Sequence, residues 1–306
     1  MLCSARKAFT MLELILVIVI LGIVSSIGST VIAQVYEGYI VQRATHRASI
    51  KTEMAINQIS NRLAYRIQDS LIARQPTTDN ILVLKNITNT TVNRDLFTAL
   101  EWIGYENDGF SAASRPGWSG FADLQNSIFT IITTVGSALY PYESTVLANL
   151  GMSATPAIRF MTTEYRSDNN AVYDSACLHA RDGKGCMFPV SFSGMNSMRF
   201  TGGGDRKVNS MTYAEFYQLS GSAYAVVPEN KGSINGIDTW DLMLYYNYAP
   251  WNGQRYDAGS SSLLAKNVSV FRFKEEANSV RLKICVVEQI AGDQTMSLCK
   301  EKAVIR

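Results

Sequence analysis

The chain has 306 residues, of which 47% are hydrophobic and 18% charged, so wholesale disorder is excluded and one large domain or two small ones fit the length. Lys and Arg number 28 against 26 Asp and Glu, and Arg6 and Lys7 supply the surplus of two. The remaining body is neutral and gives no electrostatic case for nucleic-acid binding. Two histidines, His46 and His179, and five dispersed cysteines argue against a zinc enzyme.

The first feature along the chain is a long apolar segment. Phe9–Ala33 contains one charged residue, Glu13, and Leu14–Val24 is apolar throughout. About 20 apolar residues cross the hydrocarbon core of a bilayer, and this segment is longer than a usual signal-peptide core. Arg6 and Lys7 on its short side predict a cytoplasmic N-terminus. We therefore expect a single-pass membrane-anchored protein with its body outside the cytoplasm.

Glu13 is unusual because an ionisable side chain inside a spanning helix costs about 2.5–3.5 kcal/mol on insertion scales. Such residues are often functional. The alternative is a carboxylate that stays in contact with water at the membrane surface, with the helix starting after it. On this residue alone, both interpretations stay open.

The run from Lys7 to Leu14, KAFTMLEL, resembles the processing motif of type IV pilins and type II secretion pseudopilins. The resemblance implies that residues 1–8 are a cytoplasmic leader. A prepilin peptidase would cut between Ala8 and Phe9, and Phe9 would then be N-methylated. It also implies that Glu13, the fifth mature residue, pairs with the terminal amine of a neighbouring subunit in a filament.

Two departures from the family pattern bear on the type of subunit. Ala8 stands where the family mostly has Gly. Major pilins usually carry a helix-bending Pro about 22 residues into the mature chain, where this sequence has Gly-Ser-Thr at 28–30. The second departure favours a minor subunit over a major one.

Residues 34–75 continue as an amphipathic helix in this interpretation. No Pro occurs between Phe9 and Gln75, so we expect one helix that ends before Pro76, with its first half, 9–33, in the membrane. We expect its apolar stripe to pack on the chain's own domain rather than on a partner. The stripe repeats at intervals of three and four residues and consists of Ile56, Ile59, Leu63, Ile67 and Leu71.

Residues 76–306 are expected to form one β-rich periplasmic body, which makes the fold α+β and pilin-like: a long N-terminal helix on an antiparallel sheet domain. Leu96–Ile103 and Phe121–Val135 fit helix or strand equally. The expected strands are short runs between Gly, Asn and Asp turns, at Asn80–Leu84, Ala157–Thr162, Ser197–Phe200, Ser222–Val227, Asp241–Tyr248, Ser269–Phe273, Val280–Glu288 and Met296–Ile305.

The C-terminal residues predict a hairpin stapled by a disulfide. A turn centred on Gly292 places Cys285 opposite Cys299 and, on the same face, Lys283 opposite Glu301. One register thus pairs two cysteines and two opposite charges. The segment also resembles, more loosely, the end of the larger minor pseudopilins of the J type.

The other cysteines suggest a second bridge. Cys177 and Cys186 flank a polar loop, and Cys3 lies in the leader. Four mature cysteines suit two disulfides in an oxidising periplasm, although the sequence alone allows three pairings.

Signals for catalysis or ligand binding are weak. The glycines at 202–204 lack the Lys-Ser or Lys-Thr of a phosphate loop, and His179 has no motif that indicates a nucleophile. Asp168, Asn170 and Asp174 gather oxygen atoms as a calcium site would, but without EF-hand spacing, so a solvated turn is the stronger interpretation.

An aromatic-rich segment is assigned to core packing or a subunit contact rather than to sugar binding. Its members are Trp240, Tyr245, Tyr246, Tyr248 and Trp251.

These observations lead us to expect a non-enzymatic minor pilin or pseudopilin without a cofactor. It would initiate or cap a periplasmic filament for type II secretion, pilus extension or DNA uptake. Its expected partners are other filament subunits, the prepilin peptidase and an inner-membrane assembly platform. The alternative is a periplasmic enzyme or binding protein that uses residues 9–33 only as an anchor.

Overall fold

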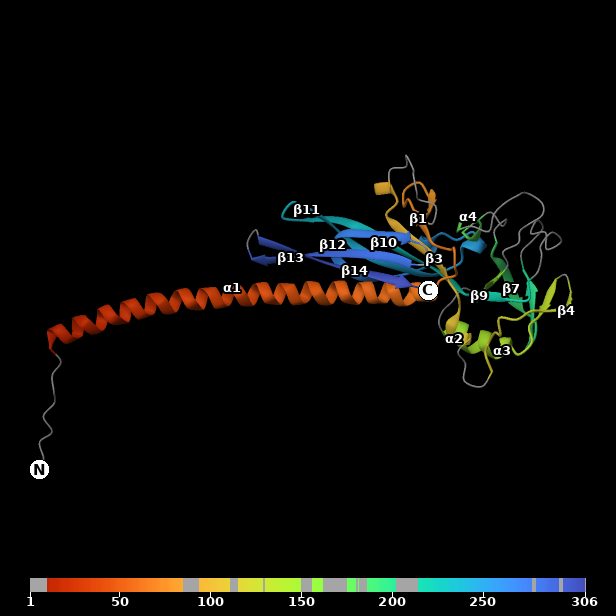
Figure 1. Ribbon diagram of the computed structural model, residues 1–306, viewed down its shortest axis with the longest axis horizontal. Coiled ribbons are helices and arrows are strands. Elements are labelled where there is room, and N and C mark those ends of the chain that lie inside the picture. The colour runs from red at the N-terminus through yellow and green to blue at the C-terminus, as the bar shows by residue number, and fades with distance from the viewer. Residues whose placement is uncertain are drawn as a thin grey trace, which may run out of the picture.

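A computed structural model describes residues 10–84, 94–110, 115–128, 130–149, 156–161, 175–179, 181, 186–201, 214–276, 279–291 and 294–305. One long helix projects from a β-rich domain, and the N-terminal end of this helix lies far from that domain (Figure 1). The expected α+β architecture, a long apolar helix followed by an antiparallel β-rich domain, is confirmed.

Helix α1 spans Met11–Ala64 and has 54 residues, which makes it about 80 Å long. Thr10 caps its start, because its extended backbone lets the side chain accept the N–H of Glu13 at 3.3 Å. Tyr65 ends it, with its N–H directed at the last-turn carbonyls.

The expected extension of the helix to Gln75 is wrong. The Ile67 N–H donates to the Ile103 carbonyl at 2.7 Å, and the Tyr65 carbonyl accepts from Tyr105 at 2.9 Å. Pairing with a strand thus satisfies backbone groups that would otherwise continue the helix. Ile67 and Leu71 are nevertheless fully buried. Beyond Ala64 the apolar spacing therefore identified buried residues correctly, although these residues are not helical.

The larger sheet has eight antiparallel strands. Its order is β14-β13-β12-β11-β10-β3-β1-β2, so the C-terminal hairpin forms one edge. The strands are β1 (Ile72–Arg74), β2 (Ile81–Val83), β3 (Ala99–Gly104), β10 (Ser222–Ile234), β11 (Ile237–Tyr248), β12 (Ser260–Glu276), β13 (Ser279–Ala291) and β14 (Gln294–Ile305).

A second, six-stranded sheet is inserted between β3 and β10, which are themselves neighbours in the larger sheet. Its order is β4-β5-β8-β7-β6-β9. A bridge between Phe121, just before β4, and Phe216, just before β9, joins its two edges. The strands are β4 (Asp123–Ile128), β5 (Ile131–Thr133), β6 (Ala157–Phe160), β7 (Phe188–Phe192), β8 (Ser197–Phe200) and β9 (Tyr217–Ser220).

This inserted unit lies at the end of the domain away from the free end of α1 (Figure 1). It has its own core around Trp118, Phe160 and Tyr217. The body expected over 76–306 therefore contains two sheets with separate cores. Short helical turns connect the strands: η2 (Arg94–Leu96), α2 (Asn107–Phe110), α3 (Leu139–Tyr142), η3 (Glu143–Leu147), α4 (Ser175–Leu178), η5 (Pro250–Asn252) and η6 (Tyr256–Ala258).

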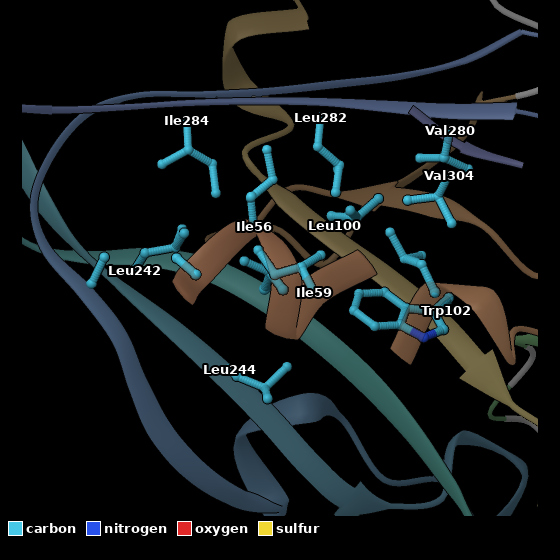
Figure 2. Packing of buried hydrophobic residues seen from close by; sticks show 14 of the residues in the cluster. Ile56, Ile59, Leu100, Trp102, Leu242, Leu244, Val280, Leu282, Ile284 and Val304 are labelled. Carbon is cyan, nitrogen blue, oxygen red and sulfur yellow. The ribbon is translucent and has the colours of Figure 1, made fainter. Parts of the chain in front are cut away.

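The second half of α1 forms the main core with the larger sheet. Ile56 and Ile59 face Leu242, Leu282 and Ile284 across the interface (Figure 2). The helix contacts mainly β13 and β14. The part of the apolar stripe that lies on α1 therefore packs on the chain's own domain, as expected.

All of the expected strands fall on strands of the structure, although β10 and β12 extend well beyond the predicted runs. The two undecided segments are also strands: β3 covers most of Leu96–Ile103, and the β4–β5 hairpin occupies Phe121–Val135. Three short strands, β1, β7 and β9, were not predicted.

The main core gives a stability prediction with a matched control. Ile59 is fully buried, whereas Ile50 on the same helix is 43% exposed. Ile59→Ala should lower the free energy of unfolding by about 2–5 kcal/mol through lost contacts and a residual cavity. Ile50→Ala removes the same atoms without leaving a cavity and should change it far less. Urea unfolding of the full chain in detergent measures both, and equal losses would contradict the packing described.

Candidate functional site

The candidate site begins at the first turn of α1. The helix starts at Met11, so Glu13 lies within the helix and not before it. A carboxylate in the first turn is favoured by the partial positive charge of the helix N-terminus. Glu13 is exposed in the single chain. The expected cleavage residues, Ala8 and Phe9, lie outside the described residues.

The first half of α1 has no partner among the described residues of the chain. Every large hydrophobic side chain from Met11 to Val35 is between 51% and 85% exposed. These residues surround the helix on all sides, and such a helix is stable only in a membrane or among other helices. α1 is long and apolar enough to cross a membrane. The site is therefore an extended contact surface with a carboxylate near its tip.

Polar contacts hold the second half of α1 against the C-terminal hairpin. Lys51 pairs with Glu288 of β13. Lys300 Nζ lies 2.6 Å from Glu53 Oε2, and Lys302 donates to Asn57 Oδ1 at 2.8 Å. These contacts flank the apolar interface and fix the helix relative to β13 and β14.

The hairpin itself has the expected register. Cys285 lies opposite Cys299, and Lys283 lies opposite Glu301. A disulfide joins Cys285 to Cys299, whose Cα atoms are 4.0 Å apart. The register shifts only near the turn, between Gln289 and Ala291. The last strand is thus covalently locked to its neighbour.

The second disulfide, between Cys177 and Cys186, holds a segment that carries His179. His179 is 3% exposed, and its Nε2 lies 2.6 Å from the Ser70 carbonyl oxygen. Its Nδ1 lies 3.5 Å from Glu101 Oε1. The Ser70 hydroxyl instead donates to the Ile67 carbonyl at 2.7 Å. His179 therefore contacts the serine backbone, not its hydroxyl, which is not the arrangement of a hydrolytic site.

Glu101 is the centre of this buried polar cluster. Arg74 Nε donates to its Oε2 at 2.5 Å, and the Tyr248 hydroxyl donates to its Oε1 at 2.9 Å. Burial by itself raises the pKa of Glu101, but the hydrogen bond and charge of His179 and the charge of Arg74 outweigh it and lower the pKa to about 2. Burial and the nearby Glu101 raise the pKa of Tyr248. Glu101 is thus an ionised anchor that ties β1, β3, β11 and the disulfide-bonded segment together.

The weak calcium candidates from the sequence, Asp168, Asn170 and Asp174, and the glycines at 202–204 lie outside the described residues. Within the described part of the chain, no three His, Cys, Asp or Glu side chains are grouped so that they could hold a metal ion.

The aromatic segment belongs to the interior for the most part. Tyr248 and Trp251 are buried, and Tyr245 packs edge-on against Tyr256 with ring centroids 5.0 Å apart. Tyr246 packs against the main core, and Trp240 is half-buried. This arrangement agrees with core packing.

A family model described as a prokaryotic N-terminal methylation motif matches residues 3–29. The match includes Ala8, Phe9 and Glu13, and it supports a type IV pilin-like protein that a prepilin peptidase processes. No curated protein and no solved structure matches the chain.

The buried cluster predicts a pH dependence of stability. The pKa of Glu101 is about 2 in the folded chain against 4.5 ordinarily, so its stabilising effect is complete above pH 4.5 and is lost as the pH falls towards 2. Glu101→Gln should lower the free energy of unfolding at pH 7 by about 3–5 kcal/mol, because Arg74 and His179 lose their carboxylate. The variant should also lose less stability than the wild type between pH 5 and pH 3.

Urea unfolding across this pH range measures both effects. Glu53→Gln, which removes an exposed carboxylate paired with Lys300, is the control and should change the profile little. A Glu101→Gln profile parallel to that of the wild type would contradict the role assigned to Glu101.

Proposed function

We propose that this chain is a minor pilin or pseudopilin, a structural subunit that initiates or caps a periplasmic filament of a type II secretion or type IV pilus system, including systems for DNA uptake. One observation carries the proposal: Glu13 lies in the first turn of a helix that is apolar on every side, within an N-terminal methylation motif. The helix would anchor the subunit in the inner membrane, with its N-terminus in the cytoplasm and the domain in the periplasm.

Processing creates the charge that Glu13 requires. Hydrolysis of the Ala8–Phe9 peptide bond by the prepilin peptidase frees a protonated amine at Phe9, which is then N-methylated. When bare helices pack together, Glu13 loses its contact with water, and an unpaired buried carboxylate is costly. The amine of an adjacent subunit is the partner that satisfies it. Only subunits with the correct axial stagger bring the two charges together.

The size and shape of the domain favour a place at the filament end. Removal of eight leader residues from 306 leaves a mature chain of 298. The inserted six-stranded unit extends the domain at the end away from the free part of α1 (Figure 1). A domain of this bulk crowds a helical lattice but is accommodated at a tip.

The chain's chemistry in this role is binding, not catalysis, and it requires no cofactor. Its partners would be other major and minor subunits, the prepilin peptidase and the inner-membrane assembly platform. The described part of the chain contains the Glu13 carboxylate, the apolar surface of α1 and the β-rich domain, which are the parts that such assembly needs.

Processing can be tested directly on protein from native membranes. Intact mass and N-terminal sequencing should show a chain that starts at N-methylated Phe9. In cells without prepilin peptidase, the leader should be retained. A mature protein that keeps Met1, or one that starts near Ala33, would contradict the proposal and favour a periplasmic enzyme or binding protein with an ordinary anchor or signal.

The role of Glu13 can be tested separately. Glu13→Ala should still be cleaved and inserted, because removal of a charge favours membrane insertion. It should be incorporated into sheared filaments at least tenfold less than the wild type, since the charge that fixes the stagger is gone. Glu37→Ala removes an exposed carboxylate from the same helix and should be incorporated normally. Equal incorporation of both variants would contradict the role of Glu13 in assembly and would indicate that α1 serves only as a membrane anchor.

A further inference from the structure

Four side chains form one stripe along α1 where its bare half meets the domain. Tyr36, Tyr39, Arg43 and Arg47 are spaced by three, four and four residues, so they lie on one side of the helix. Tyr36 is 64% exposed and Tyr39 58%, and both arginines are exposed. Across the described residues, neither arginine has an ion-pair partner. We call these four residues the juxtamembrane stripe.

The stripe lies where the domain begins. Ala44 is the first buried residue of α1, and the Thr45 hydroxyl donates to the Met296 sulfur of β14 at 3.2 Å. Before this contact the helix extends free of the domain (Figure 1). The juxtamembrane stripe is therefore adjacent to the spanning segment, and although Arg47 lies beside the first packed turn, its side chain and that of Arg43 are left exposed by the described residues of the hairpin.

Helix geometry gives the depth of the stripe. A bilayer is about 40–45 Å thick with its headgroups, around a hydrocarbon core of about 30 Å. With Leu14 at the cytoplasmic surface of the whole bilayer, Tyr36 and Tyr39 lie about 33 and 38 Å along the helix, and Arg43 about 44 Å. Tyr36 thus falls near the far end of the hydrocarbon core, Tyr39 at the boundary with the opposite headgroup layer, and Arg43 at the outer edge of that layer.

The direction of the side chains brings the guanidinium groups closer. Side chains on a helix point back towards its N-terminus, which here is the direction of the membrane. Arg47 starts about 6 Å above Arg43, but its long side chain can extend down to the phosphates. Tyrosine is enriched at this depth in membrane proteins, and arginine binds phosphate through two parallel hydrogen bonds.

We propose that the juxtamembrane stripe binds anionic phospholipid headgroups in the outer leaflet of the inner membrane and sets the depth of the subunit before assembly. The proposal rests on the membrane anchoring in the proposed function, and it requires neither peptidase processing nor filament assembly. Extraction into a filament would then begin with the release of these lipids.

Neighbouring charges leave the arginines available for this role. Among the described residues, Glu288 of β13 pairs with Lys51 and Glu53 of α1 pairs with Lys300, so these two acidic groups already have partners. Glu37 is six residues before Arg43, which puts it about 120° away around the helix. His46 is exposed and adds positive charge only when it is protonated.

A lipid fits the stripe better than an acidic side chain of a second subunit does. The two tyrosines continue the stripe towards the membrane, and the long side chains of the arginines can reach the phosphates of the headgroup layer. An acidic partner would account for the arginines but not for the two adjoining tyrosines. The stripe is also continuous with the segment that spans the bilayer.

Lipid selectivity of the full chain is the test. The protein is reconstituted in nanodiscs with equimolar phosphatidylglycerol and phosphatidylcholine, and native mass spectrometry measures the ratio of the lipids retained after release. The wild type should retain more phosphatidylglycerol. The ratio should fall by about fivefold for each arginine removed in Arg43→Gln and in the double variant Arg43→Gln/Arg47→Gln. Arg43→Lys/Arg47→Lys should keep part of the selectivity, because the positive charges remain while bidentate hydrogen bonding to phosphate is lost.

The control removes two exposed cations that lie outside α1, on β8 and β12, in Arg199→Gln/Lys266→Gln, and should keep the wild-type ratio. Thermal unfolding confirms that the variants fold. Wild-type selectivity in the double glutamine variant would overturn the proposal. If that variant also failed to enter filaments, the arginines would bind acidic residues of a neighbouring subunit instead. Since an unprocessed chain still spans the membrane, failure of the filament proposal would leave this result unchanged.

Discussion

The structure depends on a long helix, one half of which packs on the domain while the other half has no partner among the described residues. From Ala44 to Leu63, α1 buries one face against the larger sheet, and this burial gives the domain its main core. From Met11 to Val35 every large hydrophobic side chain of the same helix is more than half exposed. A continuous hydrogen-bonded ladder joins the two halves, so the packed half holds the bare half as a rigid extension. The exposed apolar surface is thus a consequence of the fold, and it remains unstable until a membrane or other helices cover it.

The C-terminal hairpin completes this attachment. β13 and β14 lie under the helix, so residues from the two ends of the chain share one interface. The Cys285–Cys299 disulfide prevents the last strand from separating, and the contacts of Lys300 and Lys302 hold the strand to the helix. A pull along α1 would therefore be shared among many contacts along its length, since the helix lies against both strands. This is the arrangement that a subunit needs if it is extracted from a membrane by its own helix.

The sequence predicted those features that are determined by residues close together in the chain. The spacing of Ile56, Ile59 and Leu63 predicted the buried face of α1, and the symmetric placement of Cys285 and Cys299 predicted the hairpin register. Features that depend on contacts between residues far apart in the sequence could not be predicted from such local patterns. The end of the helix depends on pairing between Ile67 and Ile103, and no local breaker precedes Pro76. The insertion between β3 and β10 was not recognised because its strands are short and no shift in composition marks its limits.

The candidate site shows the same division. The motif from Ala8 to Glu13 is readable because its chemistry lies in consecutive residues, whereas the cluster around Glu101 joins residues far apart in the chain. His179 illustrates the difference. From the sequence it was a remote candidate for catalysis, and in the structure it is buried in contact with the Ser70 carbonyl and the Glu101 carboxylate. The ionised groups in the described interior thus serve to hold segments together. Among the described residues, Glu13 and the juxtamembrane arginines have no ion-pair partner, and they lie on α1 outside the packed interface. In the proposed function, this separation would place the binding groups on the helix and leave the domain as the body that the helix carries.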